Sequence, residues 1–335
     1  MTSDRDSRAL HPPVPRREAL KLSRGLQPYR TLTRTAWDPE LRQPSRVPLD
    51  AMDRGHMDDT DYALGRTNAE YERLIEQAEL LRPLTERVVR AAGIGSGMHV
   101  LDIGCGMGDV SFLVSEIVGP EGSVVGIDLD GAALALADQR RAAHGISNVV
   151  FREGDARSVN PERLFDAAVG RFVLMFMSDP TATLRLVAER VRPGGVLAFH
   201  EWVAGISPAS AMDLPVLASF QDLIRKTFAL AGARVDIGAE LHWRMRDAGL
   251  EPEPRPLAEI AVCTDQGPVG YRRWALFARS LLPKIVEYGL GSEAEVVDTV
   301  ERQLHDELID AHLTPLSWLM IGQWARKPRV DRDAL

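Results

Sequence analysis

The sequence is poor in cysteine, and this scarcity excludes several kinds of site. Cys105 and Cys263 are its two cysteines in 335 residues, and they lie far apart. Two isolated cysteines cannot form the disulfide framework of a small secreted domain or a cysteine-based zinc cluster. An iron–sulfur site of the radical type would require three closely spaced cysteines. We therefore expect no bound metal of these kinds.

Long apolar runs are also missing. No stretch approaches the roughly 20 apolar residues that a membrane-spanning helix requires, and the N-terminal residues contain no apolar signal core. The formal net charge is -8, whereas nucleic-acid-binding proteins are usually basic, with clustered lysine and arginine. We therefore expect a cytoplasmic protein with no membrane or nucleic-acid partner.

Composition divides the chain into three parts. Residues 1–55 are rich in proline and arginine, which predicts a disordered tail. Residues 56–97 have apolar side chains near helical spacing, which predicts an N-terminal helical cap, with Pro83 at a kink or between two helices. Residues 98–335 are predicted to form the main domain.

The first half of the main domain alternates between strand and helix patterns. Strands are predicted in MHVLDIG, SVVGIDLD, NVVFREGD, FDAAVGRFVL and GGVLAFHEW, each separated from the next by one helix or loop. Strands joined in this way form right-handed crossovers and a parallel sheet. The predicted class is therefore α/β.

The alternation stops after Trp202. Residues 203–236 and 269–312 are mostly helical by pattern and are predicted to form lid insertions over a site at the sheet edge. A sixth strand is expected within 257–263, and WLMIGQWARK at 318–327 predicts the last strand.

The most informative segment is VLDIGCGMGD, a strand that runs into a glycine-rich turn and then a helix. Gly104 and Gly106 allow a sharp turn and a close approach to a ligand. The following helix offers free N–H groups to an anionic group. Asp128 ends the next strand, where a carboxylate can bind two ribose hydroxyls. This combination predicts a nucleotide-type cofactor.

The charges beside this turn favour one cofactor. Asp102 precedes the turn and Asp109 follows it, and both carboxylates would repel the pyrophosphate of NAD. The dinucleotide pattern also requires glycine or alanine where Asp109 stands. S-adenosylmethionine has no phosphate and brings a sulfonium, an ammonium and one carboxylate. We therefore expect S-adenosylmethionine, with NAD as the alternative.

Together with a third element, Gly154-Asp155-Ala156 after the third strand, these motifs resemble those of class I S-adenosylmethionine-dependent methyltransferases. The resemblance covers VLDIGCGMGD, GIDLD, EGDA, FDAAVGRFVL and VRPGG. It implies a Rossmann-like seven-stranded sheet whose last strand is antiparallel. It also implies cofactor contacts from Asp102, Gly104, Gly106, Asp128, Leu129, Asp155 and Ala156. Arg171, directly after the fourth strand, is a further candidate for binding the cofactor or a diphosphate.

A narrower resemblance comes from the leader YALGRTNAEYERLIEQAELLRPLTERV together with GRFVLMF and FHEW. These segments are similar to bacterial secondary-metabolism C-methyltransferases of isoprenoid diphosphates and of the teleocidin precursor. The resemblance implies that the N-terminal helix covers the cofactor and that Tyr62 and Gln77 contact it. A homo-oligomer formed through the N-terminal helices is also compatible with this arrangement.

The catalytic candidates stand at or after the end of the fifth strand. Methyl transfer to a carbon requires a group that takes the acceptor's proton. Neighbours on a strand point to opposite faces, so at most one of His200 and Glu201 faces the site. Glu201 is the preferred candidate, because the resemblance to the isoprenoid-type enzymes implies a glutamate there that stabilises a carbocation or takes its proton. His242, on a later helix, is the third candidate. Met175, Phe176, Met177 and Phe220 predict a mainly apolar acceptor pocket.

Three functions therefore remain open. The first is methylation of a lipophilic small molecule of secondary metabolism, at the carbon of an isoprenoid-like alkene with Glu201 as base. The second is O- or N-methylation of a natural product, with His200 or His242 as base. The third is a protein that binds S-adenosylmethionine without transferring its methyl group.

Overall fold

The computed structural model describes residues 68–159, 161–262, 271–314 and 316–329. All of these lie within one compact unit, Gly55–Leu335. Tyr62 and the tail expected over residues 1–55 lie outside the described residues. Within the described part, no helix is both long and apolar enough to cross a membrane.

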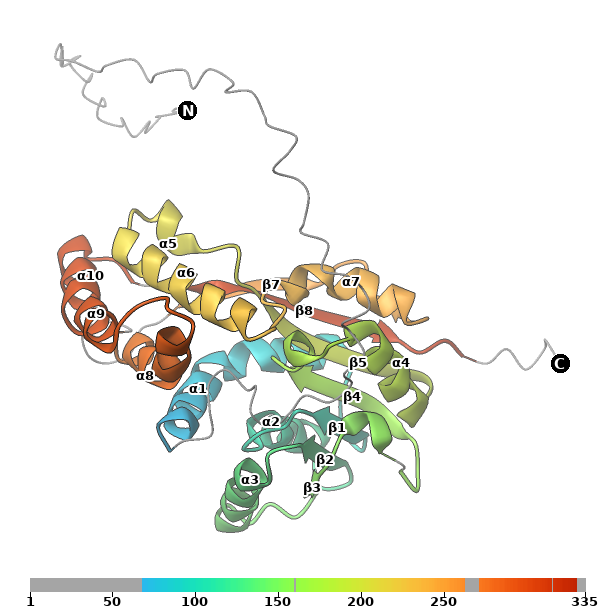
Figure 1. The fold of residues 1–335 in the computed structure, drawn as a ribbon. Helices are drawn as coiled ribbons and strands as arrows, with labels where there is room; N and C mark the ends of the chain where they lie inside the picture. Colours follow the sequence, from blue (N-terminus) through green and yellow to red (C-terminus); the bar gives the residue numbers. More distant parts are fainter. Residues whose placement is uncertain (1–67, 160, 263–270, 315, 330–335) are drawn as a thin grey trace, which may run out of the picture. The chain divides into compact units, whose positions relative to one another are not determined.

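A mixed β-sheet forms the centre of the unit (Figure 1). Its strand order is β3-β2-β1-β4-β5-β8-β6, and β7 also pairs with β8. The first five strands are parallel to their neighbours, and β8 is antiparallel to β5. The strands are β1 His99–Ile103, β2 Ser123–Asp128, β3 Val149–Glu153, β4 Phe165–Arg171, β5 Val191–Val203, β6 Glu251–Pro252, β7 Leu257–Val262 and β8 Leu316–Arg326. The predicted Rossmann-like α/β sheet with an antiparallel last strand is confirmed.

The sheet has eight strands rather than seven because one edge strand is divided. Both β6 and β7 pair with β8, at opposite ends of that strand. Pro254 and Pro256 stand between them. Proline has no N–H to contribute to a ladder of hydrogen bonds, so the pairing is interrupted there.

Helices cover both faces of the sheet, and alternating side chains of each strand supply the two cores. Val100 and Val124 belong to one hydrophobic cluster, whereas their neighbours Leu101 and Val125 belong to the other. The first cluster includes side chains of α1 Asn68–Ala91 and α2 Asp109–Val118, and the second includes side chains of α4 Pro180–Arg190 and α7 Ile237–Asp247. Helix α3 Gly131–Ala143 packs beside β3.

The remaining helices come from the two segments predicted as insertions. They are α5 Pro208–Ala211, α6 Pro215–Leu230, α8 Tyr271–Glu287, α9 Glu293–Asp298, the π-helical turn η5 Thr299–Leu304, and α10 His305–Ala311. Figure 1 shows them gathered beside α1. The carboxylate of Glu307 in α10 accepts hydrogen bonds from the backbone N–H groups of Val216 and Leu217, at 2.7 and 2.8 Å. This carboxylate caps the N-terminus of α6 and joins the two segments.

Helix α1 continues through Pro83 instead of dividing into two helices there. Its C-terminal half packs directly on β8: a Cβ at Gly322 would lie 2.2 Å from Cγ2 of Val88. Val88 is fully surrounded, with 2% of its surface exposed. The missing side chain at position 322 therefore sets how closely α1 approaches the sheet.

This contact gives a prediction for stability. Gly322→Ala should lower the free energy of unfolding by about 1–3 kcal/mol, because an added methyl group overpacks a core that cannot shift. Gly291→Ala is the matched control, since its Cβ would make ordinary contacts of 3.6 Å or more. Urea denaturation of both variants measures the difference. Equal stabilities would show that α1 is not held at this distance.

Candidate functional site

The glycine-rich turn connects β1 to α2 in backbone conformations that favour glycine. Gly104 and Gly106 have φ angles of +64° and +51°. A Cβ at Gly104 would also lie 2.5 Å from Cγ2 of Val173, in the turn after β4. A side chain at position 104 would therefore be strained and would separate the turns that follow β1 and β4.

Asp128, at the end of β2, holds this turn in place. One carboxylate oxygen accepts a hydrogen bond from the backbone N–H of Gly106 at 2.7 Å, and the other from that of Asp130 at 2.9 Å. Burial raises the pKa of Asp128, although these backbone bonds oppose the shift. Leu129, the next residue, is 51% exposed. Asp128 is thus fixed beside the glycine turn, as the motif predicts.

Asp102, on β1 just before the turn, is a buried carboxylate with an incomplete set of partners. Its Oδ2 accepts a hydrogen bond from the Ser111 hydroxyl at 2.6 Å. Its Oδ1 is buried and has no hydrogen-bond partner among the described residues. Burial raises the pKa of Asp102 to about 7, against the opposing effects of the Ser111 bond and of Arg171. An unpaired oxygen of this kind is costly unless a cationic or donor group binds it.

Arg171 ends β4 and lies opposite His200 of the neighbouring strand β5, and both side chains contact Thr85 of α1. The Arg171 guanidinium donates to Oγ1 of Thr85 at 3.1 Å, and Nδ1 of His200 lies 3.3 Å from the same oxygen. Burial lowers the pKa of His200 to about 3, and the charge of Arg171 acts in the same direction. His200 is therefore neutral at physiological pH and is a weak proton acceptor.

Glu201 points to the opposite side of β5 and binds the turn after β4. Its Oε1 accepts hydrogen bonds from the backbone N–H groups of Val173 and Leu174, at 2.9 and 2.8 Å. These residues lead into the short helix η4 Leu174–Phe176. Oε2 is buried with no partner among the described residues. Burial raises the pKa of Glu201 to about 8.

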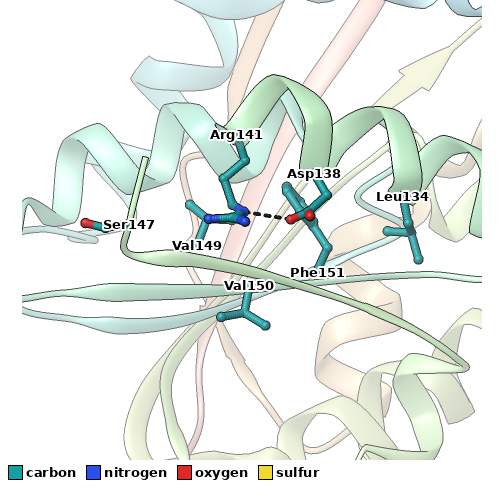
Figure 2. A pocket seen from close by; sticks show the side chains of 7 residues that line it. All are labelled: Leu134, Asp138, Arg141, Ser147, Val149, Val150 and Phe151. Carbon is teal, nitrogen blue, oxygen red and sulfur yellow. Dashed lines mark hydrogen bonds and ion pairs between the residues drawn. The ribbon is translucent and has the colours of Figure 1, made fainter. Parts of the chain in front are cut away.

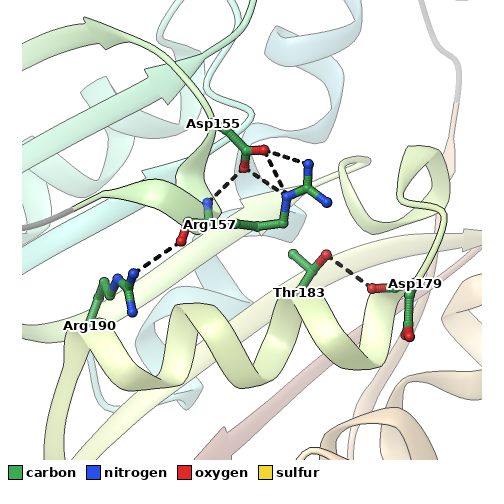
Figure 3. Close-up of polar contacts among 5 residues, drawn as sticks. All are labelled: Asp155, Arg157, Asp179, Thr183 and Arg190. Carbon is green, nitrogen blue, oxygen red and sulfur yellow. Dashed lines mark hydrogen bonds and ion pairs between the residues drawn. The ribbon is translucent and has the colours of Figure 1, made fainter. Parts of the chain in front are cut away.

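The third motif lies after β3 and is shown in Figure 3. Asp155 caps the turn η3 Ala156–Ser158 by accepting from the backbone N–H of Arg157 at 2.8 Å. The same carboxylate pairs with the Arg157 guanidinium, and the two side chains are 31% and 43% exposed. Arg190 of α4 donates to the carbonyl oxygen of Arg157 at 3.1 Å. Asp155 is therefore held in place but remains accessible.

Gln77, on α1, belongs to a buried polar chain that the sequence did not predict. Arg73 makes two hydrogen bonds of 2.7 Å to the carboxylate of Glu70, and a third of 2.7 Å to Oε1 of Gln77. Arginine only donates, so the amide oxygen of Gln77 must face it and the amide nitrogen must point elsewhere. Gln77 is thereby oriented as a hydrogen-bond donor.

His242 lies on α7, a helix that packs against β5. His242 is half-buried on α7, with its ring 5.7 Å from that of Trp243, which is 60% exposed. Leu241 and Met245 form the buried face of this helix. Among the described residues, no contact joins His242 to Glu201.

Aromatic side chains form a second group that sequence reasoning missed. Trp202, at the end of β5, has its ring centroid 4.5 Å from Phe172, 5.9 Å from Phe228 and 5.0 Å from Trp318. Of the residues predicted to line an apolar pocket, Met175 and Phe220 are buried and Phe176 lies 6.3 Å from Phe228. The cluster unites β4, β5, β8 and the lid helices, which lie far apart in sequence.

A separate hollow lies against the edge strand β3 and is drawn in Figure 2. Its volume is about 350 Å³, and its lining includes Leu134, Val149 and Phe151. Arg141 and Asp138, which stand three residues apart on α3, also line it and form a 2.7 Å ion pair (Figure 2). None of the residues discussed above as candidates lines this hollow, so we do not assign it to the same site.

Comparisons with known proteins agree with this geometry. The model of a family described as a methyltransferase domain matches residues 94–247. Aklanonic acid methyltransferase DauC of a Streptomyces species is 32% identical over 41% of this chain and 62% of its own length. A 2-phytyl-1,4-naphtoquinone methyltransferase of Synechococcus elongatus is 29% identical, over 59% of this chain and 83% of that protein.

Among solved structures, a putative methyltransferase from Bacillus halodurans has the same fold. It superposes with a TM-score of 0.50 at 18% identity, and covers 73% of this chain and 98% of that one. The chain spans less than two thirds of two curated relatives: 62% of aklanonic acid methyltransferase and 57% of a demethylmenaquinone methyltransferase of Geobacillus kaustophilus.

The buried carboxylate of Glu201 predicts a pH-dependent stability. Its pKa is raised from 4.5 to about 8 in the folded state, so folding favours the protonated form and stability is lost as the pH rises between these values. Glu201→Gln should remove this loss, at most about 1.4 kcal/mol per pH unit. Asp102 contributes a loss of the same sign, which remains in the variant.

Urea denaturation at pH 5, 6, 7 and 8 measures this difference. Glu189→Gln is the control, because the side chain of Glu189 is 62% exposed and should leave the wild-type slope unchanged. Parallel slopes for wild type and Glu201→Gln would contradict the prediction.

Proposed function

We propose that this chain is a class I S-adenosylmethionine-dependent methyltransferase and that it transfers a methyl group to a lipophilic small molecule of secondary metabolism, as supported by the methyltransferase-domain model over residues 94–247 and by the methyltransferase relatives. The observation that carries the proposal is the unpaired oxygen of Asp102 behind the glycine turn. Relatives named for aklanonic acid and for a phytyl naphthoquinone support a lipophilic acceptor.

The residues present fit S-adenosylmethionine. The buried Oδ1 of Asp102 suits an ammonium group, which would complete its hydrogen bonding. The carboxylate of Asp128, already fixed by Gly106, would accept from ribose hydroxyls. Asp155 and the adjacent backbone of Ala156 would bind adenine, and the amide nitrogen of Gln77 and the guanidinium of Arg171 would serve the cofactor's carboxylate.

S-adenosylmethionine supplies a methyl group already activated on a sulfonium. The protein's own residues then have to align the acceptor, exclude water and take a proton where the acceptor has one to lose. The lid helices that follow β5 and β7 provide the cover. Glu307 holds them together by capping α6.

We assign the proton acceptor to Glu201, which favours methylation at carbon, as in an isoprenoid-like acceptor. Oε1 binds the turn after β4 and leaves Oε2 unpaired. A pKa of about 8 lies close to physiological pH, where a general base is effective. His200, with its pKa lowered to about 3, is a poorer base.

The first test concerns the cofactor. Asp102→Asn retains an oxygen for the Ser111 hydroxyl but removes the charge, and it should weaken S-adenosylhomocysteine binding about 10- to 100-fold, as expected for a lost charge-assisted hydrogen bond. Wild-type affinity should rise between pH 6 and 8, because the Asp102 carboxyl ionises near pH 7. This rise should disappear in the variant.

Isothermal titration calorimetry measures both effects. Asp138→Asn is the control, because Asp138 pairs with Arg141 at the surface hollow and should bind like wild type. Equal affinity of Asp102→Asn and wild type across this pH range would remove the main support for the proposal.

The second test concerns proton transfer. Glu201→Gln should lower kcat at least about 100-fold, the lower range for loss of a general base, with little change in S-adenosylhomocysteine affinity. His242→Ala should stay within about twofold, since no contact joins His242 to Glu201 among the described residues.

Single-turnover assays with isotopically labelled S-adenosylmethionine and a panel of lipophilic acceptors measure these rates. The opposite ranking, with His242→Ala inactive and Glu201→Gln active, would instead favour O- or N-methylation. Binding of S-adenosylhomocysteine with no turnover on any acceptor would favour a binding protein.

A further inference from the structure

Two neighbouring tryptophans have buried N–H groups that bind none of the residues that the structure describes. Trp274 of α8 and Trp318 of β8 are each 2% exposed, and their ring centroids lie 5.5 Å apart with the planes nearly perpendicular. Among the described residues, neither indole Nε1 has a hydrogen-bond partner. A buried tryptophan usually finds an acceptor for its N–H, and an unpaired donor costs free energy. Two buried donors of this kind on neighbouring rings suggest that a ligand supplies an acceptor.

Ring contacts connect these tryptophans to the carboxyl ends of the parallel strands, where ligands of such folds bind. Trp318 contacts Trp202 at the end of β5, and Trp202 contacts Phe172, directly after β4. Phe172 has a φ angle of +55°. Such a conformation is unfavourable for a bulky residue and is found preferentially at functional sites.

A buried ion pair adjoins the other side of the aromatic group. The guanidinium of Arg73 lies 4.3 Å from the ring centroid of Phe277, which is 6.1 Å from Trp202 and 6.3 Å from Trp274. Glu70 holds this guanidinium by two hydrogen bonds. Placing an ion pair among aromatic rings costs desolvation energy, so packing alone does not account for this region.

We propose that Trp274 and Trp318 bind the methyl acceptor, and that the acceptor is a planar aromatic molecule with a carbonyl or hydroxyl oxygen. This inference rests on the proposed function and adds the chemical class of the substrate. The surrounding rings contact the flat faces of the acceptor, and the two indole N–H groups donate to its oxygen. The acceptor thereby gains orientation as well as affinity.

The alternative is that these residues only form the hydrophobic core of the lid. Replacing either tryptophan by phenylalanine separates the two explanations. The substitution keeps an aromatic ring and removes an N–H that makes no bond to any described residue, so it removes no hydrogen bond seen in this part of the chain. Trp243→Phe is the matched control, because Trp243 is 60% exposed on α7.

The experiment uses two probes with the same rings, 9-fluorenone with a carbonyl and fluorene without one. Equilibrium dialysis is carried out on the full chain with saturating S-adenosylhomocysteine. Wild type and Trp243→Phe should bind 9-fluorenone at least about tenfold more tightly than fluorene, the value of one net hydrogen bond. Trp274→Phe and Trp318→Phe should each lose most of this preference. A purely apolar core would prefer fluorene, the more hydrophobic probe.

Calorimetry with S-adenosylhomocysteine on every variant distinguishes a failure of the proposed acceptor site from a failure of the proposed function. If the cofactor analogue binds but wild type does not prefer 9-fluorenone, or both tryptophan variants keep the preference, the inference is overturned and the proposed function stands. If wild type does not bind S-adenosylhomocysteine, the proposed function fails as well.

Discussion

The buried carboxylate of Asp102, with one oxygen bonded and the other without a partner among the described residues, is the constraint on which the proposed cofactor site depends. It is placed at the centre of the sheet, with 1% of its surface exposed, and has one bond, from Ser111. A hydrophobic residue would pack there at lower cost. The carboxylate is therefore explained by what it can bind: a cationic group that approaches over the glycine turn. The same argument disfavours a pyrophosphate, because Asp128 adds a second negative charge nearby.

A second carboxylate, that of Glu307, holds together two helical segments of the protein. Glu307 of α10 satisfies two N–H groups at the start of α6 that would otherwise lack partners. Because α6 and α10 lie far apart in the sequence, these hydrogen bonds join two separate helical segments. Helix α8 extends this cover to α1 and carries Trp274 and Phe277 into the aromatic group.

The sequence predicted those parts of the site that depend on consecutive residues. The glycine turn, Asp128 and the parallel strands are local patterns, since a strand, a turn and a helix follow each other within VLDIGCGMGD. The two prolines Pro254 and Pro256 also indicate that the edge strand is divided, but our sequence prediction did not include this division. The pairing of Arg73 with Gln77 had only helical spacing to indicate it. The contact between Trp202 and Trp318 could not be predicted from the sequence. It joins β5 and β8, which are far apart in the sequence and become neighbours only through the strand order β4-β5-β8.

The alternation of β5 explains why two adjacent ionisable residues have opposite properties. His200 points toward α1, where burial and the charge of Arg171 keep it neutral. Glu201 points to the other side, where backbone N–H groups stabilise its charge but burial outweighs them. Binding the turn and accepting a proton are compatible roles for Glu201, because Oε1 accepts from the N–H groups of Val173 and Leu174, while Oε2 has no partner among the described residues. One side chain can thus fix the loop after β4 and hold a titrating oxygen beside it.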